Sequence, residues 1–130
     1  MDLISVIQKK DQKFYFAVRN HAVHSNMSAQ DKNNDEASSP AELLVGSLGL
    51  CIGMMIYRHC INHNYNNEQI SLDITYLLTD NPKRIKNITI DTNLPKNFPD
   101  EKKNAILNIS KTCVVHNTLM NKPEVDIDIV

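Results

Sequence analysis

Three cysteines give this chain its widest range of possible chemistry. Cys51, Cys60 and Cys113 are its only thiols, and a thiolate can serve as a nucleophile, a metal ligand or half of a disulfide. Cys51 and Cys60 fall in one predicted helix, where their separation corresponds to roughly 13 Å of rise, so these two cannot bridge within the chain. A pair of Cys51 with Cys113 stays open, as does the alternative that each is a small buried hydrophobe.

Two side chains near Cys51 bear on its reactivity. Ser47 precedes Cys51 by one helical turn, and Arg58 follows it by two turns at almost the same azimuth. A guanidinium close to a thiol favours the reactive thiolate. The alternative is that Arg58 marks the solvent-exposed end of the helix and pairs with an acid. The spacing leaves both interpretations open.

The histidines permit a metal hypothesis. His59 and His63 share one helix face with Cys60 between them, and His116 follows Cys113 closely. A zinc site requires converging ligands, and the chain has no second closely spaced pair of cysteines. A metal-binding module that uses His59, Cys60 and His63 is therefore kept as an alternative. Otherwise, Cys60 is expected to be a buried and inert thiol.

The helix that carries Cys51 has a well-defined start. In Ser39-Pro40-Ala41-Glu42, a serine cap is followed by proline at the first helical position and glutamate at the third. This is a capping box, and it gives Glu42 a structural role. The uncharged run from Leu43 to Tyr57 continues the helix, which is predicted to end near His63 or Asn64. Because a bilayer span needs about 20 apolar residues, the run predicts a buried central helix instead.

All three glycines of the chain lie in that uncharged run. On a helix, Gly46, Gly49 and Gly53 fall within about 60° of one another. Such a stripe lets another backbone approach closely, although each glycine costs roughly 1 kcal/mol relative to alanine. Cys51 projects about 170° away from the stripe. One face of the helix is therefore expected to pack tightly, and a different face to present a thiol.

The other segments predict an α+β class with the order β-β-β-α-β-β-α-β. A polar surface loop is predicted over residues 28–39, and Asp80-Asn81-Pro82 is expected to form a turn. The second helix is predicted from Pro99 or Asp100 to about Lys111, with Cys113 just after its end. Strands are predicted at residues 3–8, 13–18, 21–25, 70–76 and 85–92, and a closing strand carries Val125, Ile127 and Ile129.

Length and charge limit the class of protein. The net charge is −1, so charge offers no case for a nucleic-acid or membrane partner. The length fits a single domain over residues 1–130. The amino terminus has neither a basic leader nor a long apolar stretch, so we expect no signal peptide and a cytoplasmic location. Cysteines in that compartment are more often catalytic than structural.

Two blocks of the sequence resemble the OsmC/Ohr family. The segment SPAELLVGSLGLC, residues 39–51, resembles the central-helix signature of that family, and CVVHNTL, residues 113–119, resembles its second-cysteine motif. Their order and separation fit, so the resemblance covers nearly the whole chain. It implies a single OsmC-like domain that forms an intertwined homodimer, with two long central helices buried between sheets and active sites at the subunit interface. The glycine stripe would then be a helix-packing surface, toward the partner or toward the second helix.

The resemblance also implies thiol-dependent reduction of organic hydroperoxides. Cys51 would be the peroxidatic thiolate that becomes a sulfenic acid, and Cys113 would resolve it as a disulfide. An external dithiol would restore both thiols. No metal or organic cofactor is implied. The expected partners are a second copy of the chain, a small organic hydroperoxide and the dithiol reductant.

Two positions depart from the family pattern. The best-characterised peroxidases of the family place a glutamate directly after the motif proline, where it orients a catalytic arginine. Here that position is Ala41, and Glu42 comes one residue later. Val114 stands where a proline commonly follows the second cysteine. No arginine can be assigned to Cys51, and Arg19 is expected in or beside a hairpin turn. Ala41 in place of the orienting glutamate motivates an alternative function, a non-catalytic stress-associated protein that binds a small hydrophobic ligand in the dimer cleft.

Overall fold

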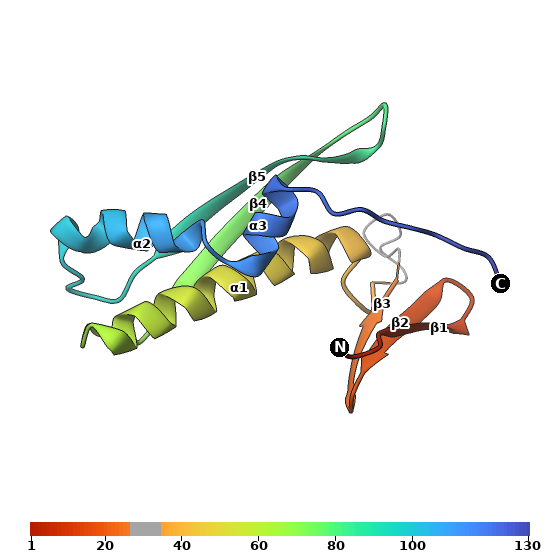
Figure 1. Cartoon of the computed structure of the whole chain (residues 1–130), viewed down its shortest axis with the longest axis horizontal. Coiled ribbons are helices and arrows are strands. Elements are labelled where there is room, and N and C mark those ends of the chain that lie inside the picture. The colour runs from red at the N-terminus through yellow and green to blue at the C-terminus, as the bar shows by residue number, and fades with distance from the viewer. Residues whose placement is uncertain (27–34) are drawn as a thin grey trace. The chain divides into compact units, whose positions relative to one another are not determined.

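The computed structural model describes residues 1–26 and 35–130. It divides into two compact units, Met1–Leu44 and Val45–Val130, each of which is considered by itself. Two antiparallel sheets and a long helix confirm the predicted α+β class (Figure 1). Most of the polar loop predicted over residues 28–39 lies outside the described residues.

The first unit contains a three-stranded antiparallel sheet. Its order is β1 (Ser5–Lys10), β2 (Lys13–Val18) and β3 (His21–Ser25). The second and third strands were predicted correctly, whereas the first begins and ends two residues later than expected. Arg19 lies in the turn between β2 and β3, as predicted. It adopts a φ of 52°, and its Nη1 donates a hydrogen bond to Oδ2 of Asp2 at 3.0 Å.

An apolar cavity lies against this sheet within the first unit. Its volume is about 420 Å³. The strands contribute aromatic and aliphatic side chains to its wall, and the chain entering the long helix closes one side. The apolar members of the lining are Val6, Phe14, Phe16, Val23, Pro40 and Leu43.

Helix α1 (Pro40–Asn62) begins with the predicted capping box. The backbone N–H of Ser39 donates to Oε1 of Glu42 at 2.8 Å, and the backbone N–H of Glu42 donates to Oγ of Ser39 at 3.3 Å. The hydrogen bond from the backbone N–H of Ser39, followed by the interaction with the Ser39 side chain, holds the pKa of Glu42 below its ordinary value. The carboxylate of Glu42 is thus committed to the start of the helix.

The second sheet is a hairpin that runs beside α1. Strands β4 (Ser71–Thr79) and β5 (Arg84–Asn93) pair antiparallel through the predicted turn. A Cβ on Gly49 would lie 2.5 Å from Cδ1 of Ile74, and one on Gly53 would lie 3.4 Å from Cδ1 of Leu72. The prediction that the glycine stripe packs against the second helix is therefore wrong, while packing toward a partner stays a prediction. The stripe makes room for side chains of β4.

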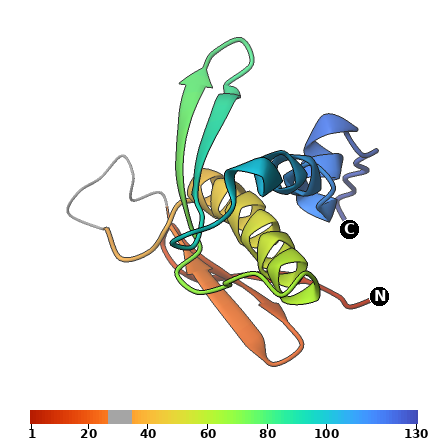
Figure 2. The ribbon, with the colours of Figure 1, turned by 90° about the vertical axis from the view of Figure 1, so that its left-hand side faces the viewer.

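The second predicted helix is confirmed, and it is followed by a helix that was not predicted. A 3₁₀ turn, η3 (Asp100–Lys102), leads into α2 (Lys103–Ser110), and α3 (Val114–Met120) comes next. Helix α3 was missed because it opens with two β-branched valines and is capped by cysteine, which is not one of the usual N-cap residues. Figure 2 shows the β4–β5 hairpin and the α2–α3 segment on different sides of α1.

The predicted closing strand is wrong for this chain. Residues 121–130 have no strand assignment, and Val125, Ile127 and Ile129 are 73%, 86% and 101% exposed. An alternating pattern forms a strand only where a neighbouring strand satisfies its backbone hydrogen bonds. In the described part of the chain no strand pairs with this segment.

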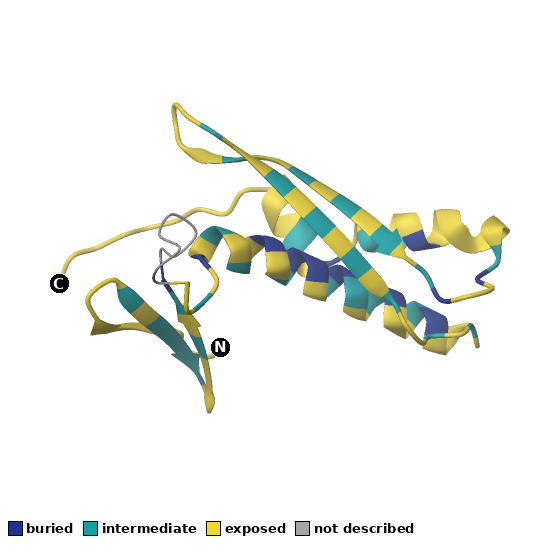
Figure 3. Cartoon of the chain, turned by 180° about the vertical axis from the view of Figure 1, so that it is seen from behind, coloured by how far each residue is buried: buried dark blue, intermediate teal, exposed yellow. Residues whose placement is uncertain are grey.

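The core of the second unit lies along one face of α1 (Figure 3). Cys60 is fully buried, with 0% exposure, as expected. The central helix is nevertheless buried on only part of its circumference. The buried cluster of the second unit consists of Leu48, Ile52, Ile56 and Cys60 of α1 together with Phe98, Ile106 and Cys113.

A different face of α1 remains exposed and apolar. Leu50, Met54, Tyr57 and Ile61 recur at helical spacing and are 65%, 65%, 50% and 46% exposed. We refer to these four residues as the α1 ridge. By length and composition alone, α1 also qualifies as a membrane span. That is weak evidence, because the core helix of a soluble protein passes the same test.

Candidate active site

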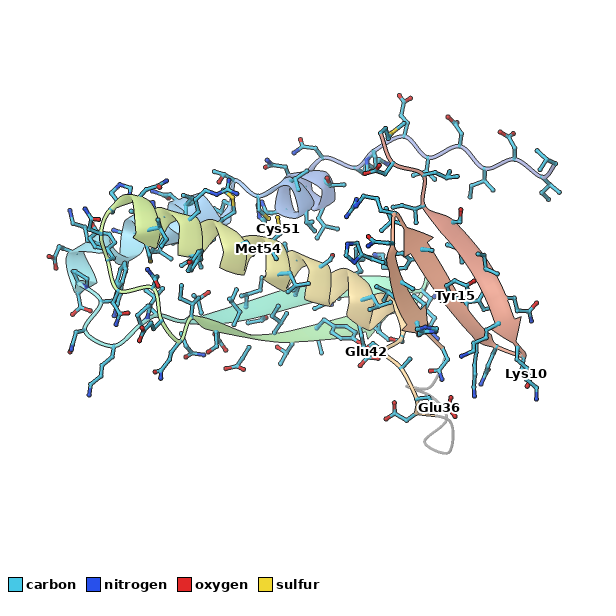
Figure 4. The ribbon with its side chains drawn as sticks, turned by 90° about the horizontal axis from the view of Figure 1, so that it is seen from below. Lys10, Tyr15, Glu36, Glu42, Cys51 and Met54 are labelled. Atoms are coloured by element: carbon cyan, nitrogen blue, oxygen red, sulfur yellow. The ribbon has the colours of Figure 1, made fainter. Side chains whose placement is uncertain are left out.

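The structure brings Cys51 and Cys113 together. Cys51 is half-buried on α1 and Cys113 is buried directly before α3, where it is only 1% exposed. Both thiols are free, and Cys51 packs against the buried cluster that contains Cys113. Each thiol contributes to the pKa shift of the other. Figure 4 shows Cys51 on the side of α1 that faces α3. The pair that the sequence left open is thus the pair that lies in contact.

Local sequence explains how Cys113 reaches this position. Ile106 of α2 and Val115 of α3 both pack on the core of the second unit, which holds the α2–α3 segment against α1. Between the two helices, the hydroxyl of Thr112 donates to the carbonyl of Ile109 at 2.7 Å and closes the end of α2. Cys113 then adopts an extended conformation, with φ −73° and ψ 152°, and begins α3.

The pKa of the Cys51 thiol is lowered from its ordinary value. Burial is the largest single influence and acts in the opposite direction, because it disfavours the charged thiolate. Hydrogen bonds from the backbone N–H of Val115, the thiol of Cys113 and the backbone N–H of Val114 together outweigh it. Cys51 is therefore the more acidic thiol of the pair.

The pKa of the Cys113 thiol is raised. Burial is again the largest influence, and the neighbouring Cys51 raises the pKa further through their hydrogen bond and through its charge. Hydrogen bonds from the backbone N–H groups of His116 and Val115 oppose this without overcoming it. Two adjacent thiols thus differ in the direction of their pKa shifts, as one would expect for a nucleophile beside a protonated partner.

The residues that the sequence placed near Cys51 are not the ones that lower its pKa. Arg58 is exposed, and it is not among the groups that shift the pKa of Cys51. The N–H groups of Val114 and Val115 take that role instead. These donors could not be predicted from the sequence, because every residue except proline carries a backbone N–H and residue type does not mark the ones that lie near a thiol. The available signal was a cysteine followed by a segment able to form a helix.

The metal hypothesis finds no support in the geometry of its three residues. The rings of His59 and His63 stack with centroids 4.0 Å apart, and Nδ1 of His63 lies 2.9 Å from the carbonyl oxygen of His59. Cys60 is buried in the core, and burial raises the pKa of its thiol. Within residues 1–26 and 35–130, no group of three or more His, Cys, Asp or Glu side chains could hold a metal ion.

His116, which the sequence analysis considered only as a possible metal ligand, is a further residue of this site. Its backbone N–H donates to Sγ of Cys113 at 3.2 Å. Its ring nitrogen Nδ1 is buried without a hydrogen-bond partner among the described residues. The residue therefore supports Cys113 through its main chain, while its imidazole lies in the same turn of α3.

An α+β fold with two thiols in contact, one on a long helix and one at the cap of a short helix, defines the class of protein. The sequence profile of the family described as OsmC-like protein matches residues 32–128. The chain therefore belongs to the OsmC-like family, as its two sequence blocks predicted. No curated protein sequence matches it.

Solved structures show the same fold. A Psychrobacter arcticus protein, named for osmotic stress induction and detoxification response, superposes with a TM-score of 0.82 at 19% identity, covering 91% of this chain and 88% of that one. An OsmC-like protein from Mycoplasma pneumoniae gives 0.80 at 18% identity, covering 94% and 89%. The organic hydroperoxide resistance protein OhrB of Bacillus subtilis gives 0.66 at 12% identity, covering 94% and 92%.

Proposed function

We propose that this protein reduces organic hydroperoxides with Cys51 as the peroxidatic thiol and Cys113 as the resolving thiol. The observation that carries the proposal is the contact between the two side chains, together with the opposite directions of their pKa shifts. A lowered pKa supplies the thiolate that attacks a peroxide, and a neighbour that stays protonated does not compete for it. Membership of the OsmC-like family supports the same reading.

The first step consumes the peroxide. The Cys51 thiolate attacks the distal oxygen of R–O–OH, the O–O bond breaks, and the products are Cys51 sulfenic acid and an alkoxide that takes a proton to become the alcohol. The N–H groups of Val114 and Val115 donate toward the attacking sulfur. They hold the thiolate in place before it reacts.

The second step closes the disulfide. Sγ of Cys113 attacks Sγ of the sulfenic acid, the S–O bond breaks, and the proton of Cys113 leaves with the hydroxyl group as water. Little movement is needed, because the two thiols are already close enough for each to shift the pKa of the other. An external dithiol then reduces the disulfide and is itself oxidised to a disulfide, which returns both cysteines to thiols.

The functional form is proposed to be a cytoplasmic homodimer in which each chain is a single OsmC-like domain. The α1 ridge supports this assembly, because Leu50, Met54, Tyr57 and Ile61 form a continuous exposed apolar surface on the longest helix. A second copy of α1 is the partner with the matching pattern. We expect this contact to remove the ridge from water and to complete the burial that was predicted for the central helix.

Names of structural relatives are consistent with this chemistry without establishing it. The Bacillus subtilis protein is named an organic hydroperoxide resistance protein. A Legionella pneumophila relative carries the same description, with a TM-score of 0.70 at 10% identity over 93% of this chain and 90% of that one. At such identities the likeness is one of fold. The preference for organic over hydrogen peroxide therefore needs its own test.

A second candidate function is the binding of a small hydrophobic ligand without catalysis. The observation that favours it is the apolar cavity of about 420 Å³ against the first sheet, since small-molecule sites are typically 300–1,000 Å³ and mostly apolar. Ala41 also favours this function. In the efficient peroxidases of the family a glutamate at this position orients the catalytic arginine, and alanine cannot do so.

Turnover assays separate the two functions. Purified protein is supplied with cumene hydroperoxide and excess dihydrolipoamide, and peroxide consumption is followed with hydrogen peroxide run in parallel. The peroxidase proposal predicts consumption that is abolished by Cys51→Ser, is strongly reduced by Cys113→Ser and persists in Cys60→Ser, the matched control. Consumption that is indifferent to Cys51→Ser would reject it. A protein that binds an apolar probe dye but never consumes peroxide would instead support the ligand-binding function.

A further inference from the structure

Helix α1 ends in a well-defined capping motif. Asn64 follows the helix with a φ of 57°, and its backbone N–H donates to the carbonyl oxygen of Ile61 at 3.3 Å. The backbone N–H of Tyr65 donates to the carbonyl oxygen of Cys60 at 2.9 Å. These two hydrogen bonds around a left-handed residue form a Schellman motif, with asparagine in the position usually taken by glycine. The motif turns the chain so that Tyr65 packs on the core of the second unit.

Four aromatic rings meet at this end of α1. The imidazoles of His59 and His63 lie one helical turn apart and stack with centroids 4.0 Å apart. The ring of Tyr65 stacks on that of His63 at 5.7 Å and meets the ring of Phe98 edge-on at 5.4 Å. His63 is exposed and Phe98 is buried, so the rings form a continuous line from solvent to the core. We refer to these four residues as the α1 end cluster.

The two imidazoles of the cluster have no counterion. In the part of the chain that the structure describes, neither His59 nor His63 forms an ion pair with a carboxylate. Nδ1 of His63 lies 2.9 Å from the carbonyl oxygen of His59, and the phenol of Tyr65 is the other titratable group that faces the pair. The charged residues that flank the cluster in sequence, none of which shifts the pKa of His59, are Arg58, Glu68, Lys96 and Asp100.

A stacked pair of this kind resists a second positive charge. One positive charge near the carboxyl end of a helix is stabilised by the helix dipole, whereas a second, at a ring centroid 4.0 Å away, is opposed by the first. Burial, and to a lesser degree the charge of His63, lower the pKa of His59. If the end of α1 opens, a histidine in water takes up its proton with a pKa of about 6.5. The opened end therefore binds more protons than the closed end below that pH, so acid favours opening.

The segment that follows the cluster lines a cavity. This cavity lies between α1 and β4 within the second unit and has a volume of about 620 Å³. Asn67, Gln69 and Ile70, which come directly after the turn at Tyr65, contribute to its wall. A change at the cluster would therefore be transmitted along a few residues to the cavity.

We propose that the α1 end cluster is a pH-sensitive switch, in which a proton taken up by His59 beside His63 separates the stacked rings, moves Tyr65 away from Phe98 and opens residues 63–70, one wall of the cavity. The opening is expected to stay local, because β4 and β5 pair with each other along their length. Neither thiol of the candidate active site takes part. The inference is therefore independent of the proposed peroxidase function.

Amide hydrogen exchange of the full chain tests the switch, because local opening sets the protection of the amides that it exposes. Exchange is followed by mass spectrometry at pH 7.5, 6.5 and 5.0, and each rate is divided by the intrinsic rate at that pH. His59→Phe keeps a ring of similar size in the stack but removes the proton acceptor. His24→Phe is the matched control, since it makes the same change where His24 contacts Tyr15 in the first unit, with centroids 5.5 Å apart.

In wild type, protection of residues 61–68 should fall about tenfold or more between pH 7.5 and 5.0, since an opening that takes up one proton shifts about tenfold per pH unit below the histidine pKa. Strand β5 should change by less than about twofold over the same range. His24→Phe should behave as wild type, whereas His59→Phe should lose most of the fall. His63→Phe should show a smaller fall than wild type, because the burial of His59 remains.

Three results would overturn the proposal. They are a constant protection of residues 61–68 in wild type, an equal fall in His59→Phe, and a fall that β5 shares, which would indicate global unfolding. The fall is compared within each variant, so a uniformly lower protection does not affect the conclusion. If His59→Phe does not fold, His59→Asn takes its place with the same expected loss of the pH effect.

Discussion

Cys51 on α1 packs against the buried cluster that contains Cys113, the residue at the start of α3, and the pKa values of the two thiols are shifted in opposite directions. Each shift has a cause in the same small region. Backbone N–H groups of α3 stabilise the Cys51 thiolate, while burial and the neighbouring Cys51 keep Cys113 protonated. This asymmetry is the main support for the proposal that Cys51 is the nucleophile.

The pH dependence of the reaction follows from this asymmetry. Because the pKa of Cys51 is lowered, its thiolate persists to lower pH than that of an ordinary cysteine, whose pKa is about 8.5. The second-order rate constant for sulfenic acid formation should therefore reach half its maximum below pH 8.5 and fall as the pH drops through the lowered pKa. Stopped-flow peroxide consumption between pH 5 and 9 provides the profile. A midpoint at or above 8.5 would contradict the assignment.

The α1 ridge leads to a prediction about assembly. Met54→Lys places a charge in the middle of the ridge and should convert the homodimer to monomers, because a desolvated unpaired charge strongly opposes association. Light scattering on a size-exclusion column reports the mass. Leu107→Glu is the matched control, since Leu107 is an apolar residue of α2 with 55% exposure, and it should stay dimeric. A dimeric Met54→Lys protein would place the interface elsewhere.

The close approach of α1 to β4 predicts the effect of filling a glycine. Gly49→Ala sets a methyl group against Cδ1 of Ile74, and overpacking of this kind costs about 1–3 kcal/mol, offset by roughly 1 kcal/mol of better helix propensity. Urea unfolding should show a net loss of about 1 kcal/mol. Ile74→Val removes the clashing atom, so the double variant should lose less than the sum of the two single changes. Strict additivity would argue against the contact.

Sequence analysis located the framework of this site but not its finer parts. The capping box at Ser39 and Glu42 and the alternating pattern of β4 are local signals, and both were predicted correctly. Packing of the glycine stripe on the second helix was wrong, since a stripe of small residues indicates a close approach but not which element approaches. The exposed segment around Ile127 was predicted as a strand from its alternating pattern, but the pattern does not show whether a neighbouring strand is present to pair with it.

The start of α3 marks the limit of prediction from sequence most clearly. Cysteine is an uncommon helix cap, and Val114 and Val115 favour extended structure, so propensity alone argued against a helix there. The contact between Cys51 and Cys113 required the fold, because only the packing of Ile106 and Val115 on the core brings the second cysteine to α1. The two family blocks contain both cysteines of this contact. They did not reveal the backbone donors between them.

The stacked imidazoles at the end of α1 predict sensitivity to acid. Burial, and to a lesser degree the charge of His63, lower the pKa of His59. The unfolded chain therefore binds more protons than the folded one below the ordinary histidine pKa of about 6.5, and stability falls as the pH falls through this range. The melting temperature should drop less between pH 7.5 and 5.5 in His59→Asn than in wild type. An equal drop in both would show that His59 does not contribute.

The central claim is tested most directly by counting free thiols after one equivalent of cumene hydroperoxide. The reduced chain has three free cysteines. The account predicts that only one thiol per chain remains, that it is Cys60, and that peptide mapping recovers a disulfide between Cys51 and Cys113. Three thiols still free after exposure would contradict the claim that this pair carries out a peroxidase reaction.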